Sequence, residues 1–477
     1  MKDLRADIAV IGAGAGGLSV AAGAAQLGLK VVLFEKHEMG GDCLNYGCVP
    51  SKALISAAKA AHAVRNAAPF GVMAEPPAIA WDRVKAHIQK VIETIAPVDS
   101  QARFEGLGCT VIREQARFLD PGTVASASVR VKARRIVIAT GSRAVVPSIK
   151  GLADAPYLTN ETIFSLQAIP KRLVILGAGP IGVELGQAFA RLGAKVMVIE
   201  PGRALARLDA EAASLVVAAL RRDGVDVREA WTAIGVTGAG EALELRLSGP
   251  RGESETVAAT HILVAAGRAP VLEGLDLEAG GVAYDAMGVR VKPNLRSTTN
   301  PRVWAVGDVA GKALLTHAAG WHASVFVRNA LFKAPSTDDA LPMPMAIYGD
   351  PEVGQIGLTE AEAKDRFGEA AVRVARSSFE DNDRAQAEAS FEGFAKIVAT
   401  KKGVILGATI VGEGAGDLIQ TIAIAMSNKL KMRALTNYVA PYPTRGEIVK
   451  RVAGQWYAPI VFSPRTKALV AALQLIP

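Results

Sequence analysis

The chain has 477 residues, a length typical of about three domains. Half of the residues are hydrophobic, and 47 glycines accompany only 5% aromatic residues, a composition that favours α/β architecture. The net charge of +8 is spread along the chain without a basic stripe interleaved with aromatic residues, which argues against nucleic-acid binding. No apolar run nears the ~18 residues of a membrane span and no secretory leader is recognisable, so we expect a cytoplasmic protein without a membrane span.

The first predicted unit is a strand, a glycine turn, a helix and a second strand over residues 6–35. The apolar run Ile8–Ile11 enters the turn Gly12–Gly17, a helix of small residues follows, and the strand Lys30–Phe34 ends on Glu35. Glycines let the backbone approach a pyrophosphate, the helix N-terminus stabilises its charge, and the acid accepts hydrogen bonds from a ribose diol. This unit predicts a dinucleotide site.

The next segment, residues 40–52, contains two of the three cysteines, Cys43 and Cys48. On a regular helix their Cα atoms would lie about 8–9 Å apart, whereas a disulfide requires roughly 4.4–6.8 Å. The chain must therefore leave helical geometry between them, which Gly47 permits. Pro50 suits the first turn of a helix over Ser51–Val64, whose N-terminus favours a thiolate at Cys48.

A close cysteine pair in a reducing compartment indicates catalysis or metal binding rather than a structural disulfide. Metal binding is the weaker of the two, because no Cys/His set with ligand spacing accompanies the pair, and we predict no metal site. The third cysteine, Cys109, lies in an apolar stretch typical of a strand, and we expect it to be a buried structural thiol.

The pattern of residues 6–35 recurs over Leu173–Glu200. The distance from the first glycine to the Leu-Gly pair is 15 residues in both copies, and the distance to the terminal acid is 23 residues in both. Two complete copies predict two dinucleotide sites. A carboxylate at Glu200 repels the 2′-phosphate of NADP, so NADH is favoured, although Arg203 and Arg207 lie near enough to offset this repulsion.

Three further strands end in glycine turns, and we expect them to add to these sites. They are Arg135–Gly141, His261–Arg268 and Val303–Val309, the last containing Gly307-Asp308. An acid behind a glycine at the carboxyl end of a strand can hold a sugar-like chain of hydroxyls.

Together these segments resemble the class I pyridine nucleotide–disulfide oxidoreductases, the family of glutathione reductase, lipoamide dehydrogenase and mercuric reductase. The resemblance is carried by both glycine motifs, the CxxxxCxPSK segment, Ala139-Thr140-Gly141, Gly307-Asp308 and the run Gly349–Gly354. It implies an α/β fold with two Rossmann-like dinucleotide-binding domains plus an α+β interface (dimerisation) domain. The implied domains are 1–150 for FAD, 151–270 for NAD(P), 271–342 completing the FAD domain, and 343–477 for the interface of a homodimer.

The resemblance also implies FAD at the first site and NAD at the second, with NADP less favoured. Cys48 would be the thiolate beside the flavin and Cys43 the exposed thiol that attacks the substrate, while Lys52 would pair with Glu184 near the reactive flavin nitrogen. His317 is similar to a histidine that structures the flavin site. The residues expected to hold FAD are Gly12, Gly14, Gly17, Glu35, Gly41, Lys52, Thr140, Gly141, Gly307 and Asp308. Those expected to hold the nicotinamide dinucleotide are Gly177, Gly179, Gly182, Glu200, Gly267 and Arg268.

The chain departs from the disulfide-reducing relatives near its end, where they have a His-Pro-Thr-x-x-Glu segment. The partner subunit's histidine is their general acid/base, and here the matching residues are Tyr442 and Glu447, our remaining candidates for catalysis. A phenol, with an ordinary pKa of about 10, is far from the ideal for proton transfer at neutral pH. Mercuric reductases are similar in placing a tyrosine there, but they also carry a vicinal cysteine pair near the C-terminus, which this chain lacks.

We therefore expect an FAD-dependent enzyme that passes electrons from NADH to the Cys43–Cys48 disulfide and on to a small-molecule or small-protein acceptor. A metal ion, a quinone or a disulfide is the expected acceptor, as in the mercuric-reductase-like branch. The alternatives are a dihydrolipoamide dehydrogenase and, from another class, a redox-sensing or scaffolding flavoprotein with little turnover.

Overall fold

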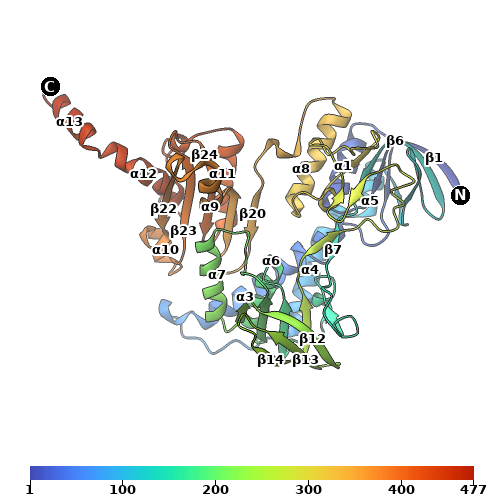
Figure 1. Ribbon diagram of the computed structural model, residues 1–477, viewed down its shortest axis with the longest axis horizontal. Coiled ribbons are helices and arrows are strands. Elements are labelled where there is room, and N and C mark those ends of the chain that lie inside the picture. Colours follow the sequence, from blue (N-terminus) through green and yellow to red (C-terminus); the bar gives the residue numbers. More distant parts are fainter. Residues whose placement is uncertain (477) are drawn as a thin grey trace. The chain divides into compact units, whose positions relative to one another are not determined.

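The computed structural model describes residues 1–476, which form two compact units (Figure 1). The first unit comprises residues 1–203 and 223–340, and the second comprises residues 204–222 and the chain from residue 341 on. Helices and strands alternate through most of the chain, so the expected α/β class is confirmed.

The first unit is built on a sheet of seven strands. Their order is β3 (Thr110–Ile112), β2 (Val31–Phe34), β1 (Lys2–Ile11), β6 (Val129–Ile138), β5 (Thr123–Ala125) and β4 (Arg117–Asp120), with β19 (Val303–Ala305) also paired to β6. Strand β1 is parallel to β2 and β6, and β19 is parallel to β6, so a segment three hundred residues later completes the sheet that the N-terminus begins. β1 starts at Lys2, before the apolar run Ile8–Ile11 that predicted it, because residues 2–6 also pair with β6.

A second, parallel sheet follows in the same unit. Its strands are, in order, β11 (Asp226–Glu229), β10 (Lys195–Glu200), β9 (Arg172–Leu176), β15 (His261–Val264) and β8 (Tyr157–Leu158). Its core is shared with the antiparallel strands β12 (Thr232–Ala239), β13 (Ala242–Ser248) and β14 (Ser254–Ala259). Two short antiparallel pairs are β7 (Ser142–Ala144) with β16 (Arg268–Pro270), and β17 (Tyr284–Asp285) with β18 (Gly288–Val289).

Both glycine turns lie at the carboxyl ends of parallel strands, in equivalent positions. Gly12 follows β1 and Gly177 follows β9, with φ angles of +105° and +109°. A Cβ at either glycine would lie 2.4 Å from the carbonyl oxygen that ends the neighbouring strand, that of Ala139 or Ala265. Only glycine fits such a turn. The first turn leads into α1 (Ala15–Gln26) and the second leads into α6 (Pro180–Arg191). The other helices of the first unit are α2 (Gly41–Asn45), α3 (Cys48–Arg65), α4 (Trp81–Asp99), α5 (Gln101–Gly106) and α8 (Thr316–Phe326).

The second unit has one antiparallel sheet of five strands. They are, in order, β20 (Pro344–Ile347), β21 (Val353–Gly357), β24 (Ile405–Val411), β23 (Phe394–Thr400) and β22 (Val372–Ser378). The helices of this unit are α7 (Ala210–Arg222), α9 (Glu360–Phe367), α10 (Asp383–Ala387), α11 (Ala415–Ser427), α12 (Glu447–Val461) and α13 (Pro464–Leu473). Buried side chains of α11 and α12 form one core with the sheet, whereas α13, which continues α12 at the C-terminal end in Figure 1, buries none.

Candidate active site

The two candidate redox cysteines lie on two helices that a short break separates. Cys43 is in α2, the chain leaves the helix at Tyr46 and Gly47, and Cys48 is the first residue of α3. A Cβ at Gly47 would lie 2.9 Å from Asp42 Oδ2 and 3.0 Å from the Asp42 carbonyl oxygen, so this close approach requires glycine. The expected departure from helical geometry is confirmed. The helix begins three residues before the expected Ser51, which places Cys48 at its N-terminus.

The two thiols differ in protonation. Cys43 is half-buried and Cys48 is exposed, so the expectation that Cys43 is the exposed thiol of the pair is wrong for this structure, because Cys43 is enclosed in α2 while Cys48 begins α3. The hydrogen bond that Cys43 donates to Cys48 is the main cause that lowers the pKa of Cys48 to about 6, and Thr316 and Lys52 act in the same direction. The same hydrogen bond, together with burial, raises the pKa of Cys43. Cys48 Sγ also lies 3.3 Å from Thr316 Oγ1, so the N-termini of α3 and α8 both stabilise negative charge on this sulfur.

One turn further along α3, Lys52 Nζ donates a hydrogen bond to Glu184 Oε2 over 2.8 Å. Glu184 is a buried residue of α6, the helix that starts at the second glycine turn. This ion pair therefore links the helix of the redox cysteines to the second dinucleotide motif, and the roles of both residues in catalysis stay predictions.

The two strand-end acids make equivalent contacts. Glu35 accepts hydrogen bonds from the backbone N–H groups of Ala13 and His37, each over 2.7 Å. Glu200 accepts from the backbone N–H groups of Ala178 and Gly202, each over 2.9 Å. In each copy one carboxylate oxygen is held against the glycine turn, which is the placement that a ribose-binding acid needs.

The glycine turns fit two dinucleotides. A Cβ at Gly141, Gly179 or Gly267 would meet no atom within 4 Å, so open space borders the backbone at these positions. Gly41 lies against the first turn, where its Cβ would come within 2.7 Å of the Gly14 Cα. Open space beside helix N-termini and a ribose-binding acid suit a pyrophosphate-containing cofactor, which FAD and a nicotinamide dinucleotide both are.

The backbone turn at Gly307, just before the candidate flavin acid Asp308, is held by a buried histidine that no sequence motif marked. Gly307 donates its backbone N–H to His322 Nδ1 over 3.0 Å, and His322 Nε2 lies 2.7 Å from Asp338 Oδ1. Since Nδ1 accepts, Nε2 carries the proton and donates to Asp338. His322 is fully buried whereas His317, the histidine singled out in the sequence, is exposed. Burial raises the pKa of Asp308, and Ser142 Oγ donates to its Oδ2.

Arg268, expected to hold the nicotinamide dinucleotide, contacts Ser142 and Asp42, and its role toward that dinucleotide stays a prediction. Its Nε and Nη2 atoms donate to Ser142 Oγ and to the Ser142 carbonyl oxygen, each over 2.8 Å. Its Nη2 also lies 3.2 Å from Asp42 Oδ2. No motif in the sequence pairs Arg268 with Asp42, which lies more than two hundred residues earlier.

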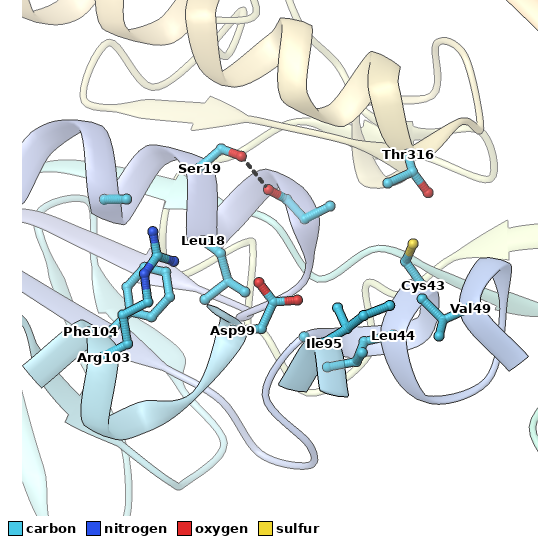
Figure 2. Close-up of a pocket in the computed structure, with 13 residues that line it drawn as sticks. Leu18, Ser19, Cys43, Leu44, Val49, Ile95, Asp99, Arg103, Phe104 and Thr316 are labelled. Atoms are coloured by element: carbon cyan, nitrogen blue, oxygen red, sulfur yellow. Dashed lines mark hydrogen bonds between the residues drawn. The ribbon is translucent and has the colours of Figure 1, made fainter. Parts of the chain in front are cut away.

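A pocket of about 330 Å³ opens beside Cys43 (Figure 2). Residues of α1, α2, α3, α4, α5 and α8 line it, mainly apolar ones such as Leu18, Leu44 and Ile95. Cys43 and Thr316 lie at one end, and Asp99 and Arg103 lie away from them. Burial raises the pKa of Asp99, although Arg103 acts against this rise. Of the two redox cysteines only Cys43 lines the described pocket.

The remaining candidates, Tyr442 and Glu447, lie in the second unit. Tyr442 is 71% exposed and its phenol donates a hydrogen bond to Asp383 Oδ2 over 2.8 Å, which raises the pKa of Tyr442. Glu447 is the first residue of α12 and accepts a hydrogen bond from the Thr444 backbone N–H. Asp383 was not foreseen, because it lies 59 residues from Tyr442 in the chain.

Over residues 1–476 the side chains form no cluster of three or more His, Cys, Asp or Glu able to hold a metal ion. In the same part of the chain no helix is both long and apolar enough to span a membrane.

Comparisons with known proteins agree over most of the chain. Residues 6–323 match the pyridine nucleotide-disulphide oxidoreductase family, and residues 343–453 match its dimerisation domain. A mercuric reductase of Streptomyces lividans is 33% identical over 94% of this chain and 95% of its own length. A dihydrolipoyl dehydrogenase of Thermus scotoductus is 36% identical over 92% and 95%. The structure of the HOCl-induced flavoprotein disulfide reductase RclA from Escherichia coli, as a Cu(II) complex, superimposes with a TM-score of 0.83 at 24% identity, covering 94% of this chain and 99% of that one.

Proposed function

The chain belongs to the pyridine nucleotide-disulphide oxidoreductase family, whose members are FAD-dependent and use NAD(P)H, and we propose that it reduces an acceptor at Cys43. FAD, when bound, supplies the two-electron chemistry that links NADH to the Cys43–Cys48 disulfide. Gly12, Gly14, Glu35, Gly141 and Asp308 are the residues proposed to hold it. The acceptor takes its electrons from the dithiol and leaves the disulfide behind.

The difference between the two thiols is the observation that carries this proposal. Cys43 faces a pocket and keeps its proton, whereas the sulfur of Cys48 is anionic near neutral pH. A proton moved from Cys43 Sγ to Cys48 Sγ along their hydrogen bond produces a thiolate at the pocket without an external base. With a disulfide as the acceptor, the Cys43 thiolate attacks one sulfur and the other sulfur leaves as a thiolate that takes the proton from Cys48. The Cys48 thiolate then attacks Cys43 Sγ, releases the second acceptor thiolate and re-forms the Cys43–Cys48 disulfide, so that one electron pair has passed to the acceptor.

The acceptor is proposed to be one whose reduction requires little acid/base catalysis. Tyr442, at the position of the relatives' histidine, has a raised pKa because it donates to Asp383, so it is a poor base at neutral pH. A metal ion, a quinone or a disulfide with a good thiolate leaving group meets this requirement. We propose that the protein is a homodimer in which the partner subunit's Tyr442 reaches the thiols, since the chain carries the dimerisation domain of the family.

The test is NADH oxidation by the purified holoenzyme against Hg(II), quinones, oxygen, lipoamide and glutathione disulfide. We expect turnover with at least one acceptor that Cys43→Ser abolishes. Cys48→Ser should also remove the long-wavelength absorbance that a thiolate beside oxidised flavin gives after two-electron reduction. Survival of that band in Cys48→Ser would refute the assignment, and no turnover with any acceptor would favour a redox-sensing or scaffolding protein.

Dihydrolipoamide dehydrogenase activity is the second candidate, because a dihydrolipoyl dehydrogenase is 36% identical over 92% of the chain. Tyr442→His separates the two candidates. It should raise lipoamide turnover at least tenfold if the missing base limits that reaction, since a general base typically contributes about 10²–10⁴-fold. Equal lipoamide activity in Tyr442→His and the native enzyme would contradict our account of the missing base.

We propose NADH rather than NADPH as the reductant. The Glu200 carboxylate is held against the second glycine turn by Ala178, where it would meet the 2′-position of the adenosine ribose. Glu200→Gln should therefore lower the preference for NADH, measured as kcat/KM for NADH divided by kcat/KM for NADPH.

A further inference from the structure

Asp42 places a negative charge beside the redox thiols. It precedes Cys43 in α2, and its Oδ1 accepts a hydrogen bond over 2.8 Å from Asn160, which is buried. The carboxylate raises the pKa of both Cys43 and Cys48. An uncompensated Asp42 would therefore oppose the thiolate on which the proposed reaction depends.

Arg268 supplies the compensating charge from a distant part of the chain. Its guanidinium is 15% exposed and lies 3.2 Å from Asp42 Oδ2. The same group donates twice to Ser142, and Ser142 Oγ donates in turn to Asp308. The Arg268 guanidinium thus contacts Asp42 beside the thiols directly and is linked through Ser142 to Asp308, the acid proposed to bind the flavin.

Arg268 also acts on the second acid, Asp308. Burial raises the pKa of Asp308, the Asp42 charge raises it further, and Arg268 lowers it. An arginine suits the position because its five donors form a rigid fork that can contact Asp42 and Ser142 together, which a lysine cannot do.

We propose that Arg268 is a positioning residue for the thiol pair and the flavin-site acid: it neutralises Asp42 beside Cys43 and holds Asp308 through Ser142. This inference deepens the proposed function, because it assigns a residue to the same site. The role of Arg268 at the nicotinamide dinucleotide, which the sequence suggested, stays a separate prediction.

The test follows the Cys48 thiolate in the reduced full-length holoenzyme, by the pH dependence of iodoacetamide labelling of Cys48 read by mass spectrometry. The charged or titratable groups that act on this thiol are Cys43, Lys52 and Asp42. Arg268→Met should raise the labelling midpoint by about 0.5–1 pH unit, as expected for an unscreened charge a few ångströms away. Asp42→Asn should lower the midpoint, and the double variant should return it to near the native value.

Arg268→Lys separates the two parts of the proposal. It keeps the charge, so the midpoint should stay near the native value, but it loses the fork to Ser142, so the dissociation constant for FAD should rise about three- to tenfold. Arg143→Met is the matched control, because Arg143 lies on the same short ribbon and pairs with Glu273 at the surface. Arg143→Met should change neither the labelling midpoint of Cys48 nor the dissociation constant for FAD.

A native midpoint in Arg268→Met, or an unchanged or raised midpoint in Asp42→Asn, would overturn the proposal. A large rise in the KM for NADH in Arg268→Met, with an unchanged labelling midpoint, would also overturn it, because Arg268 would then act at the nicotinamide site and not on the thiols. If Arg268→Met does not fold, Arg268→Lys decides: a native dissociation constant for FAD in Arg268→Lys would overturn the link from Arg268 through Ser142 to Asp308. These readouts need no acceptor, so they stay decisive even if every acceptor fails and the proposed function falls.

Discussion

The proton shared by Cys43 and Cys48 gives a prediction that concerns single residues. The pKa of Cys48 is lowered to about 6 from an ordinary value of 9.0, chiefly because Cys43 donates to it. A thiol with a lowered pKa is anionic above that pKa, so Cys48 is mostly thiolate at pH 7 and loses its charge as the pH falls through 6. Cys43→Ala removes the donor, and we expect the thiolate to disappear well above pH 6, as measured by ultraviolet absorbance of the reduced protein.

Cys43→Ser is the control for this change, because a serine hydroxyl still donates a hydrogen bond. Its Cys48 midpoint should stay close to 6, below that of Cys43→Ala. Identical midpoints in the two variants would show that the electrostatic effects of Lys52 and the helix N-termini, rather than the hydrogen bond, hold the charge.

At the scale of elements, α8 supports the Gly307–Asp308 turn through His322. His322→Ala would leave the Gly307 N–H group buried without an acceptor, a cost of about 1–3 kcal/mol, and would leave Asp338 without its donor. We expect the turn to loosen and FAD to be released several degrees below the native release temperature. The measurement is the rise of flavin fluorescence on heating.

Ser324→Ala is the control on the same helix, since its hydroxyl bonds only the preceding helical turn at the surface. It should leave the release temperature unchanged. A native release temperature in His322→Ala would mean that the strand β19 alone positions the turn.

The elements themselves were largely predictable, since each pattern has a local cause. The two glycine turns, the helix after Pro50 and the strands ending at Gly141 and Gly307 all follow from short-range steric and capping rules. Element ends were less predictable. β1 reaches back to Lys2 because residues 2–6 pair with β6, a tertiary contact that no local pattern reports. α3 begins at Cys48, before the proline that the sequence suggested for its first turn.

At the scale of the whole molecule, a buried lysine ties residues 204–222 to the rest of the second unit. Lys396 Nζ lies 3.1 Å from Asp209 Oδ1 and 2.9 Å from Glu211 Oε2, and both Lys396 and Asp209 are less than 10% exposed. Lys396→Met would leave the Asp209 carboxylate buried without its cation, a change that typically costs about 3–5 kcal/mol. We expect a clear fall in the midpoint of thermal unfolding, followed by circular dichroism.

Lys364→Met tests whether this effect depends on burial, because Lys364 pairs with Glu360 on the exposed face of α9. It should change the unfolding midpoint little, since exposed pairs contribute about 0–1 kcal/mol. Adding Asp209→Asn to Lys396→Met should restore part of the loss, and a failure to do so would contradict the role of the uncompensated charge.

The candidate site was predictable only in part. The cysteine pair, the strand-end acids and the Lys52–Glu184 pair follow from motifs, whereas His322, Asp383 and the contact between Arg268 and Asp42 do not. Each of these three contacts joins segments that are far apart in the chain, and the fold alone brings those segments together. The pocket beside Cys43 is also a product of packing, because six helices contribute to it.

The late arrival of β19 has a consequence for how the protein is made. On the side of β6 that faces away from β1, residues 136–138 gain a neighbouring strand only after residues 303–305 have left the ribosome. At about 5–20 residues per second, the nascent chain carries this open strand edge for on the order of ten seconds while the intervening sheet assembles. An exposed edge is a template for wrong pairing. Translation pauses within residues 139–302, or loss of nascent-chain chaperones, should therefore increase aggregation of this protein. The increase should be larger than for a protein in which the strands of each sheet follow one another in the sequence.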